Sequence, residues 1–221
     1  IVPEMAAVRV PDPMPFAGAA LLGCGVMTGV GAATRIASLR WGDVAMVLGC
    51  GAVGLSAVQG CVLAGAGAIV AVDPNPARRL LAQQLGATHA VEPDEAADVA
   101  RVLTQDRGAD VVIESAGAPA GFRLSVEAVR PGGQVVWLGK VGVQQTMEFR
   151  WGSLMQEKRI TRSSYGGARP QQDFPLLARA YLEGRLKLDE MISARIGLEA
   201  INEGFAALKR GETVRSVVMF A

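Results

Sequence analysis

The stretch VAMVLGCGAVGLSAVQGCVLAGAGAIVAV, residues 44–72, decides the fold of this chain. It contains no Asp, Glu, Lys, Arg or His, and Asp73 follows it directly. An apolar run of about 20 residues can cross a bilayer as a helix. However, a glycine inside a helix costs about 1 kcal/mol relative to alanine. The glycines of this stretch therefore argue against one continuous helix; they are Gly49, Gly51, Gly54, Gly60, Gly65 and Gly67.

We predict that this stretch forms a βαβ unit: a strand at 44–48, a helix at 52–64 and a strand at 68–72. The unit is apolar throughout because helices cover a parallel sheet on both faces. Its first turn, 49–54, reads GCGAVG, so glycines occupy a GxGxxG pattern where the strand passes into the helix. In that pattern the glycines allow a tight turn, a close approach of pyrophosphate and close packing of helix on strand. The free N–H groups and the dipole of the helix then face the negative charge.

Asp73 adds weight to this interpretation because it lies nineteen residues beyond Gly54 (73 − 54), at the end of the second strand. A carboxylate there can accept hydrogen bonds from the adenosine ribose hydroxyls, and it would repel a 2′-phosphate. Alternatively, the glycines only serve packing and Asp73 is a turn residue of Asp-Pro-Asn-Pro. That alternative leaves the coincidence of the two signals unexplained, so we expect NAD rather than NADP.

Composition limits the classes of function. The chain has 221 residues, half of them hydrophobic, so it can bury a sizeable core. A formal net charge of +1 gives no attraction to nucleic acid or an anionic membrane, and we expect neither as a partner. The three cysteines cannot form a closed set of disulfides, and no signal segment opens the chain. We therefore expect a soluble, cytoplasmic protein.

Alternation of strands and helices continues beyond Asp73. Further strands are predicted at 88–91, 110–114, 133–138 and 159–164, with helices at 76–85, from 93–95 onward and at 119–129. This pattern predicts a doubly wound, six-stranded parallel sheet of the Rossmann type (an α/β fold), with ligands at the carboxyl ends of the strands. Glu114-Ser115-Ala116-Gly117 and Leu138-Gly139-Lys140 occupy two of those ends.

The flanking segments do not extend this alternation. We expect a short strand over 5–10, two helices meeting near Cys24 within 16–39, and a turn at 131–133. After Gly167 we expect a helix at 170–183, a strand at 192–196, an amphipathic helix at 198–209 and a strand at 214–220. The domains are therefore predicted as 27–165 for the sheet, with 1–26 and 166–221 as remnants of a second domain.

Several segments together resemble one family. They are LLGCGVMTGVGAA at 21–33, GCGAVG at 49–54, VDPNPAR at 72–78, LGATHAV at 85–91, YGG at 165–167 and INEGFAALKRGETVRSVV at 201–218. The chain is similar to the coenzyme-binding half of medium-chain, zinc-dependent alcohol dehydrogenases. The resemblance implies that 27–165 is an NAD-binding domain, that 1–26 is a linker and remnant of a catalytic, GroES-like domain, and that 166–221 returns to that domain.

The resemblance also implies roles for single residues. Cys24 matches a ligand of the catalytic zinc, which polarises the alcohol oxygen. Asp73 and Arg78 match contacts of the adenosine ribose, and Arg215 matches a guanidinium against the pyrophosphate. The pyrophosphate turn corresponds to Gly49, Cys50, Gly51, Ala52, Val53 and Gly54; the nicotinamide end corresponds to Thr28, Val53, Leu138, Gly139, Lys140, Ser163 and Tyr165.

The chain departs from the family pattern in its zinc ligands. A catalytic zinc needs three protein ligands and an open position. The family supplies the other cysteine, a histidine and the proton relay from an N-terminal domain that would precede Ile1. His89, the only histidine, falls in a predicted strand, and we interpret it as a surface or packing residue. The catalytic residues therefore stay unassigned, and we expect the chain to bind NAD without turning over alcohol or retaining stoichiometric zinc.

The leading hypothesis is an NAD-dependent zinc alcohol dehydrogenase that oxidises a primary alcohol or a hydroxymethyl-thiol adduct, present here as its coenzyme-binding portion. Two alternatives are a zinc-free quinone or enoyl reductase, which Asp73 and Cys24 oppose, and a non-catalytic nucleotide-binding module. We also expect a homodimer through 146–164. Residues 146–149 alternate as in a strand and 159–164 form the edge strand, whose unpaired backbone groups need a partner.

Overall fold

A computed structural model describes residues 2–220 of the chain. The chain divides into two compact units, one formed by Thr28–Ala168 and the other by the residues up to Met27 together with those from Arg169 onward. We call them the larger and the smaller unit. The division falls after Met27 and Ala168, whereas the sequence predicted boundaries after 26 and 165. The assignment of the smaller unit to a catalytic domain stays a prediction.

The larger unit contains a six-stranded parallel sheet with the strand order β3-β2-β1-β4-β5-β6. This order and the parallel pairing confirm the predicted doubly wound fold. The two strands predicted from the charge-free stretch, β1 and β2, pair from Val44↔Ala68 to Leu48↔Val72. The strands are β1 (Val44–Leu48), β2 (Ala68–Val72), β3 (His89–Val91), β4 (Ala109–Glu114), β5 (Val129–Trp137) and β6 (Arg159–Arg162).

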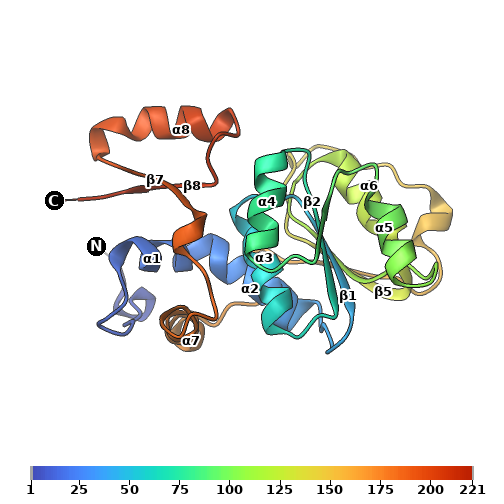
Figure 1. Cartoon of the computed structure of the whole chain (residues 1–221), viewed down its shortest axis with the longest axis horizontal. Helices are drawn as coiled ribbons and strands as arrows, with labels where there is room; N and C mark the ends of the chain where they lie inside the picture. The colour runs from blue at the N-terminus through green and yellow to red at the C-terminus, as the bar shows by residue number, and fades with distance from the viewer. Residues whose placement is uncertain (1, 221) are drawn as a thin grey trace. The chain divides into compact units, whose positions relative to one another are not determined.

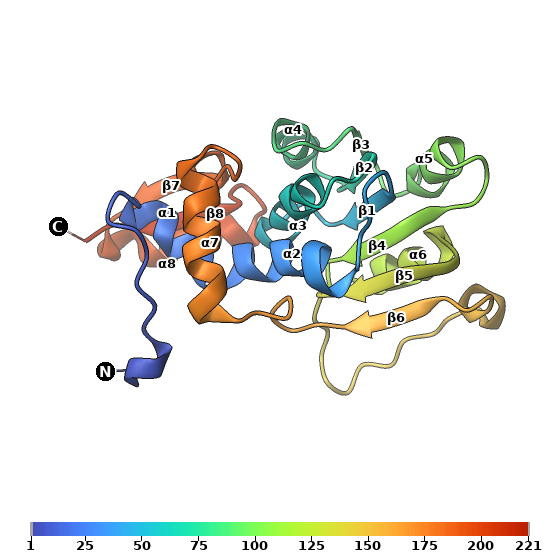
Figure 2. The same cartoon turned by 90° about the horizontal axis from the view of Figure 1, so that it is seen from below.

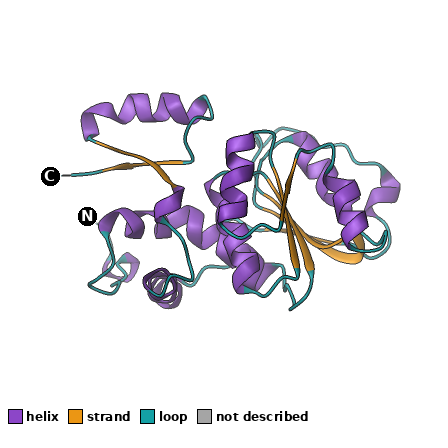
Figure 3. Cartoon of the chain, viewed as in Figure 1, coloured by secondary structure: helices purple, strands orange, loops and turns teal. Residues whose placement is uncertain are grey.

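Helices cover both faces of this sheet (Figures 1 and 3). On one face lie α3 (Ala52–Leu63) and α4 (Pro76–Gln84), and on the other lie α5 (Ala96–Leu103) and α6 (Pro119–Ala128). The start of α4 follows from the sequence, because the Asn75 side chain accepts a hydrogen bond from the Ala77 N–H and Pro76 occupies the first helical position. Both layers together explain why β1 and β2 are apolar on both faces.

The core on the α5–α6 face takes every second residue of the central strands. Met46 and Leu48 of β1 pack there with Val70 and Val72 of β2. Side chains alternate between the two faces of a strand, so the residues between them point toward α3. Because both faces of β1 and β2 are buried, these strands are held in place, and so are the turns that follow their carboxyl ends.

One detail of the sheet differs from the sequence prediction. The predicted turn at 131–133 lies within β5, whose pairing with β4 shifts register between Ala109 and Val111, and Gly132 takes the left-handed value φ +67. The turn is therefore a bulged start of the strand. As predicted, β6 is the edge strand, and Figure 2 shows it beside β5.

The segment 16–36 is one continuous helical run, so the predicted break near Cys24 is wrong. It consists of α1 (Phe16–Leu21), a π-helical segment η2 (Leu22–Val26), α2 (Met27–Gly31) and a second π-helical segment η3 (Ala32–Ile36). Two of its glycines serve close packing, because a Cβ at Gly29 or Gly31 would collide with the carbonyl oxygen of Val53 or Gly166, respectively. By length and composition this helix could cross a membrane, but 72% of its apolar window is buried inside the protein, as in a core helix.

The smaller unit contains a two-stranded parallel sheet, β7–β8. The strand predicted over 5–10 is wrong, because the chain forms a 3-10 turn at Glu4–Ala6 and no regular structure over 7–10. The elements of this unit beyond 169 are α7 (Pro170–Leu182), η5 (Asp189–Met191), β7 (Ile192–Ile196), η6 (Leu198–Ala200), α8 (Ile201–Lys209) and β8 (Arg215–Val218).

The segment between β5 and β6 also differs from expectation. Residues 146–149 do not form a strand, and the next element is the 3-10 helix η4 (Trp151–Leu154). The reason is that the Phe149 ring stacks on Trp137 at a centroid distance of 5.7 Å. Trp137 also meets Phe122 edge to face, so Phe149 belongs to an aromatic cluster instead of an alternating strand.

Candidate functional site

The carboxyl edge of the sheet brings the ends of three strands of the larger unit together. The Gly49 N–H donates to the Val72 carbonyl at 2.8 Å, and the Ser115 N–H donates to the Leu48 carbonyl at 2.9 Å. The Ser115 hydroxyl lies 3.0 Å from the same carbonyl oxygen and 2.9 Å from that of Gly49. These bonds tie the ends of β1, β2 and β4 together. Sequence reasoning placed Ser115 at this edge but assigned it no role.

The three glycines of the turn do different jobs. Gly49 has φ +88, a left-handed conformation that favours glycine. A side chain at Gly54 would collide with the Gly49 carbonyl oxygen, so that position is set by close packing. By contrast, a Cβ at Gly51 would meet no atom of the protein within 4 Å. Gly51 thus borders open space.

The start of α3 lies directly beside that space. Gly51 is its N-cap residue, and no side chain caps the helix there. The first N–H groups of a helix lack partners within the helix, and they carry the positive end of its dipole. An uncapped N-terminus next to open space is a site suited to an anion such as a pyrophosphate.

Asp73 is fixed to the same turn. Its side chain is buried, with 4% of the residue exposed. Oδ2 accepts the Cys50 N–H at 2.7 Å, and Oδ1 accepts the Asn75 N–H at 2.8 Å. A carboxylate has about four acceptor sites, so each oxygen retains capacity for a ligand hydroxyl.

Two arginines flank Asp73. Nη1 of Arg78 lies 4.0 Å from Asp73 Oδ2, and the buried Nε of Arg78 has no hydrogen-bond partner among the described residues. Arg79 donates from Nη1 to the carbonyls of Asp73 (2.8 Å) and Pro74 (3.1 Å), and from Nη2 to Glu92 (3.0 Å). Arg79 therefore holds the turn in place, a role that the adjacent Arg78-Arg79 pair does not reveal in the sequence.

The thiols of the larger unit are not reactive groups. Burial raises the pKa of Cys50 to about 12, and the nearby Asp73 charge contributes to this rise. Burial alone raises the pKa of Cys61 to about 12 as well. Both thiols are protonated at neutral pH and pack as small apolar residues.

The remaining predicted residues of the larger unit are distributed along the same chain segments. The Leu138 N–H donates to the Glu114 carbonyl at 2.8 Å, and the Ser163 N–H donates to the Trp137 carbonyl at 3.0 Å. Both hydrogen bonds join neighbouring strand ends. Thr28, Leu138, Gly139 and Ser163 are buried, Ala52, Val53 and Tyr165 are partly exposed, and Lys140 is exposed.

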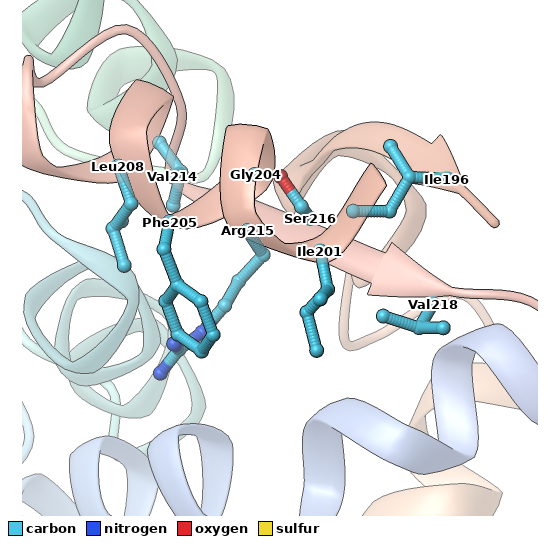
Figure 4. Close-up of a pocket in the computed structure, with 9 residues that line it drawn as sticks. All are labelled: Ile196, Ile201, Gly204, Phe205, Leu208, Val214, Arg215, Ser216 and Val218. Carbon is cyan, nitrogen blue, oxygen red and sulfur yellow. The ribbon is translucent and has the colours of Figure 1, made fainter. Parts of the chain in front are cut away.

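Cys24 and Arg215 belong to the smaller unit, and their surroundings are described within it. Cys24 is exposed in the π-helical segment η2. Arg215 lies on β8 and lines an apolar groove of about 150 Å³, where its side chain runs beside Phe205 of α8 (Figure 4).

No zinc site is assembled by the residues that the structure describes. Within 2–220, no three His, Cys, Asp or Glu side chains come together in a way that could hold a metal ion. Cys24 offers a single thiol, and the partly exposed His89 has Nδ1 2.9 Å from the Thr88 hydroxyl. These residues do not fit a catalytic zinc, which needs three protein ligands.

Comparison with known proteins agrees with the geometry of the sheet edge. The family model "Zinc-binding dehydrogenase" matches residues 52–183. The alcohol dehydrogenase class-3 of Cereibacter sphaeroides is 36% identical over all of this chain and 61% of its own length. The S-(hydroxymethyl)glutathione dehydrogenase of Paracoccus denitrificans is 32% identical, again over all of this chain and 61% of its own length.

The similarity extends from the sequence to the three-dimensional structure. A benzyl alcohol dehydrogenase from Acinetobacter calcoaceticus superimposes with a TM-score of 0.92 at 28% identity, covering 97% of this chain and 59% of its own. The chain thus spans about 60% of the length of the relatives it matches. It belongs to the zinc-binding dehydrogenase family and matches the coenzyme-binding half of the medium-chain zinc alcohol dehydrogenases.

Proposed function

We propose that the larger unit binds NAD at the carboxyl edge of its sheet. The observation that carries this proposal is the open space at Gly51 beside the uncapped start of α3, with the Asp73 carboxylate tied to the same turn through the Cys50 N–H. The pyrophosphate oxygens would accept hydrogen bonds from the free N–H groups at the start of α3. The adenosine ribose hydroxyls would donate to the Asp73 carboxylate.

The other residues then take roles around the dinucleotide. The buried Nε of Arg78, which has no partner among the described residues, is suited to a ribose or phosphate oxygen. We assign the nicotinamide end to Leu138–Lys140 together with Thr28, Val53, Ser163 and Tyr165. For Arg215, in the smaller unit, we keep the role that the family resemblance implies, because a guanidinium can offer two donors to phosphate oxygens.

Asp73 also supports selection of NAD over NADP. With the ribose bound as proposed, a 2′-phosphate would lie beside the Asp73 carboxylate, and like charges about 4 Å apart repel by about 4 kcal/mol at an effective dielectric constant of 20. Pro74 occupies the position directly after Asp73, so that position supplies no arginine to a 2′-phosphate; Arg78, whose Nη1 lies 4.0 Å from Asp73 Oδ2, is the nearby guanidinium.

Calorimetric titration of the chain with both dinucleotides tests this proposal. We expect tight binding of NAD and much weaker binding of NADP. Asp73→Asn removes the charge and should reduce the preference by about tenfold or more. Asp94→Asn serves as the control, because Asp94 is an exposed carboxylate in the loop after β3. This variant should keep the preference for NAD over NADP. Equal affinities of the unaltered chain for NAD and NADP would refute the role of Asp73.

We further propose that the complete protein transfers hydride between NAD and a primary alcohol or a hydroxymethyl-thiol adduct. The support is the family and the names of its relatives, alcohol dehydrogenases and an S-(hydroxymethyl)glutathione dehydrogenase. The chain as given supplies Cys24 alone toward a zinc, so alcohol turnover requires ligands from outside these residues. Metal analysis after dialysis, together with an alcohol oxidation assay, tests whether outside ligands are required. A chain that holds zinc tightly and oxidises alcohol by itself would refute that requirement.

We also propose a cytoplasmic location, which accords with Cys24, Cys50 and Cys61 all being free thiols.

We also propose that the chain forms a homodimer through β6 and the segment before it. The open edge of β6 can pair with a second copy, and exposed apolar side chains occur on β6 and in the chain before it: Ile160 is 39% exposed, Trp151 78% and Val143 99%. Arg162 bends back to the carbonyls of Trp137 and Ser163, so it does not shield the edge as a free charge.

Light scattering measures the mass of this assembly directly. Val143→Lys and Ile160→Lys should shift the chain toward monomer. Val102→Lys serves as the matched control, because Val102 is a similarly exposed valine on α5 at 81%. A dimer that survives both edge variants, or a chain that is already monomeric, would show that β6 is not the interface.

A further inference from the structure

We propose that Glu114 is a positioning residue. It holds two backbone segments, 115–118 and 138–140, in a fixed relation at the nicotinamide end of the site. This inference rests on the proposed binding of NAD. Glu114 is the last residue of β4, where that strand reaches the ligand-binding edge of the sheet.

The Glu114 carboxylate is fully buried, with 0% of the residue exposed. Oε1 accepts the Gly117 N–H at 2.8 Å, whereas the buried Oε2 has no hydrogen-bond partner among the described residues. Burial raises the pKa of this carboxyl group, and the N–H groups of Gly117, Ala116, Gly139 and Ala118 oppose that rise. The carboxylate thus lies among backbone donors drawn from both segments.

The two segments interlock around this residue. The N–H groups of Leu138 and Gly139 both donate to the Glu114 carbonyl, at 2.8 and 3.1 Å. A Cβ at Gly139 would collide with Glu114 Oε2, and a Cβ at Gly117 would lie 2.9 Å from the Lys140 carbonyl oxygen. Both the backbone and the side chain of Glu114 therefore set the spacing between the segments.

Stability alone does not account for a carboxylate at this position. Burying an ionisable group with one oxygen unpaired is unfavourable, and an apolar residue of similar size would avoid that cost. The neighbouring Val112 and Ile113 are both fully buried apolar residues. What a carboxylate adds is an acceptor that fits the surrounding N–H groups and so selects one arrangement of the two segments.

Glu114→Gln should disturb this arrangement while keeping size and shape. The amide replaces one acceptor oxygen with an NH₂ donor, which opposes the Gly117 N–H if it takes the place of Oε1 and lies against Gly139 if it takes the place of Oε2. We expect the affinity for NAD to fall about tenfold, the effect of one poorly made buried hydrogen bond. The affinity for ADP should change less than about twofold, because ADP is held by the turn at 49–54 and by Asp73.

The experiment is a calorimetric titration of the full chain and its variants with NAD and with ADP. Glu127→Gln is the control, since Glu127 is an exposed glutamate on α6 that meets Arg150 only at 3.9 Å. Hydrogen exchange provides a second readout: the amides of Gly117 and Gly139 should lose protection in Glu114→Gln and keep it in Glu127→Gln.

If the unaltered chain binds neither ligand, the proposed NAD binding fails and this inference fails with it. If the chain binds both, then equal losses of NAD and ADP in Glu114→Gln, or no loss of either, overturn the role of Glu114 alone. Should Glu114→Gln not fold, Glu114→Asp keeps the charge but withdraws the carboxylate by one methylene from the Gly117 N–H. That variant must show the same selective loss of NAD, and a loss of ADP to the same degree would refute the inference.

Discussion

The two units of the chain differ in how they bury their apolar side chains. In the larger unit, helices cover both faces of a six-stranded sheet, and every strand residue in the α5–α6 core is at most 3% exposed. In the smaller unit, Leu198 and Phe205 near α8 remain 56% and 58% exposed, and the sheet has two strands, a size that is marginal by itself. The larger unit therefore buries a sheet between two helix layers and can hold a ligand site at its edge, whereas the smaller unit buries side chains such as Leu186, Leu188 and Met191 but leaves α8 with exposed apolar residues.

The largest contrast should appear when one phenylalanine is truncated in each unit. Phe122 is 5% exposed and meets Trp137 edge to face, so Phe122→Ala should lower the free energy of unfolding by about 3–5 kcal/mol. Phe205→Ala removes a half-exposed ring and should lower it by about 1 kcal/mol or less. Urea denaturation measures both. Similar losses for the two variants would contradict the half-exposed placement of Phe205.

A smaller effect concerns pH and is confined to the larger unit. Burial raises the pKa of Glu114 in the folded chain above its ordinary value of 4.5. The folded state then binds more protons than the unfolded state, so the stability contributed by Glu114 is complete below pH about 4.5 and is lost as the pH rises through the folded pKa. Glu114→Gln lacks this titration.

The stability of the unaltered chain relative to Glu114→Gln should therefore decrease as the pH is raised from 5 toward neutrality. Urea unfolding of both proteins across this range measures the difference, and the other carboxylates cancel because both proteins share them. A difference that stays constant, or that grows with pH, would contradict the raised pKa of Glu114.

The larger unit shows both what the sequence could predict and what it could not. The strands at 44–48 and 68–72 match β1 and β2, and the helix predicted at 52–64 ends one residue early, at Leu63. Burial on both faces leaves an apolar pattern in the sequence that local rules can interpret. The prediction failed where tertiary contacts decide: Gly29 and Gly31 do not break a helix because close packing needs them, and Phe149 leaves a strand pattern to stack on Trp137.

The candidate site divides in a similar way. Glycines with special backbone requirements and a carboxylate at a set spacing are visible in the sequence, so Gly49–Gly54 and Asp73 were identified. The parts played by Arg79 and Glu114 were not, because they depend on which backbone carbonyls and N–H groups the fold brings to those side chains. Neither adjacent arginines nor a glutamate at a strand end carries that information in the sequence.

The measurement that tests the account most directly is an NAD titration of Gly51→Val. Gly51 has φ −76 and ψ −175, an extended conformation that valine adopts readily, and a Cβ there meets no protein atom within 4 Å. The account predicts unchanged stability in urea and loss of NAD binding, because the side chain fills the space proposed for the pyrophosphate. A stable Gly51→Val variant that binds NAD as tightly as the unaltered chain would contradict the placement of the dinucleotide at this turn.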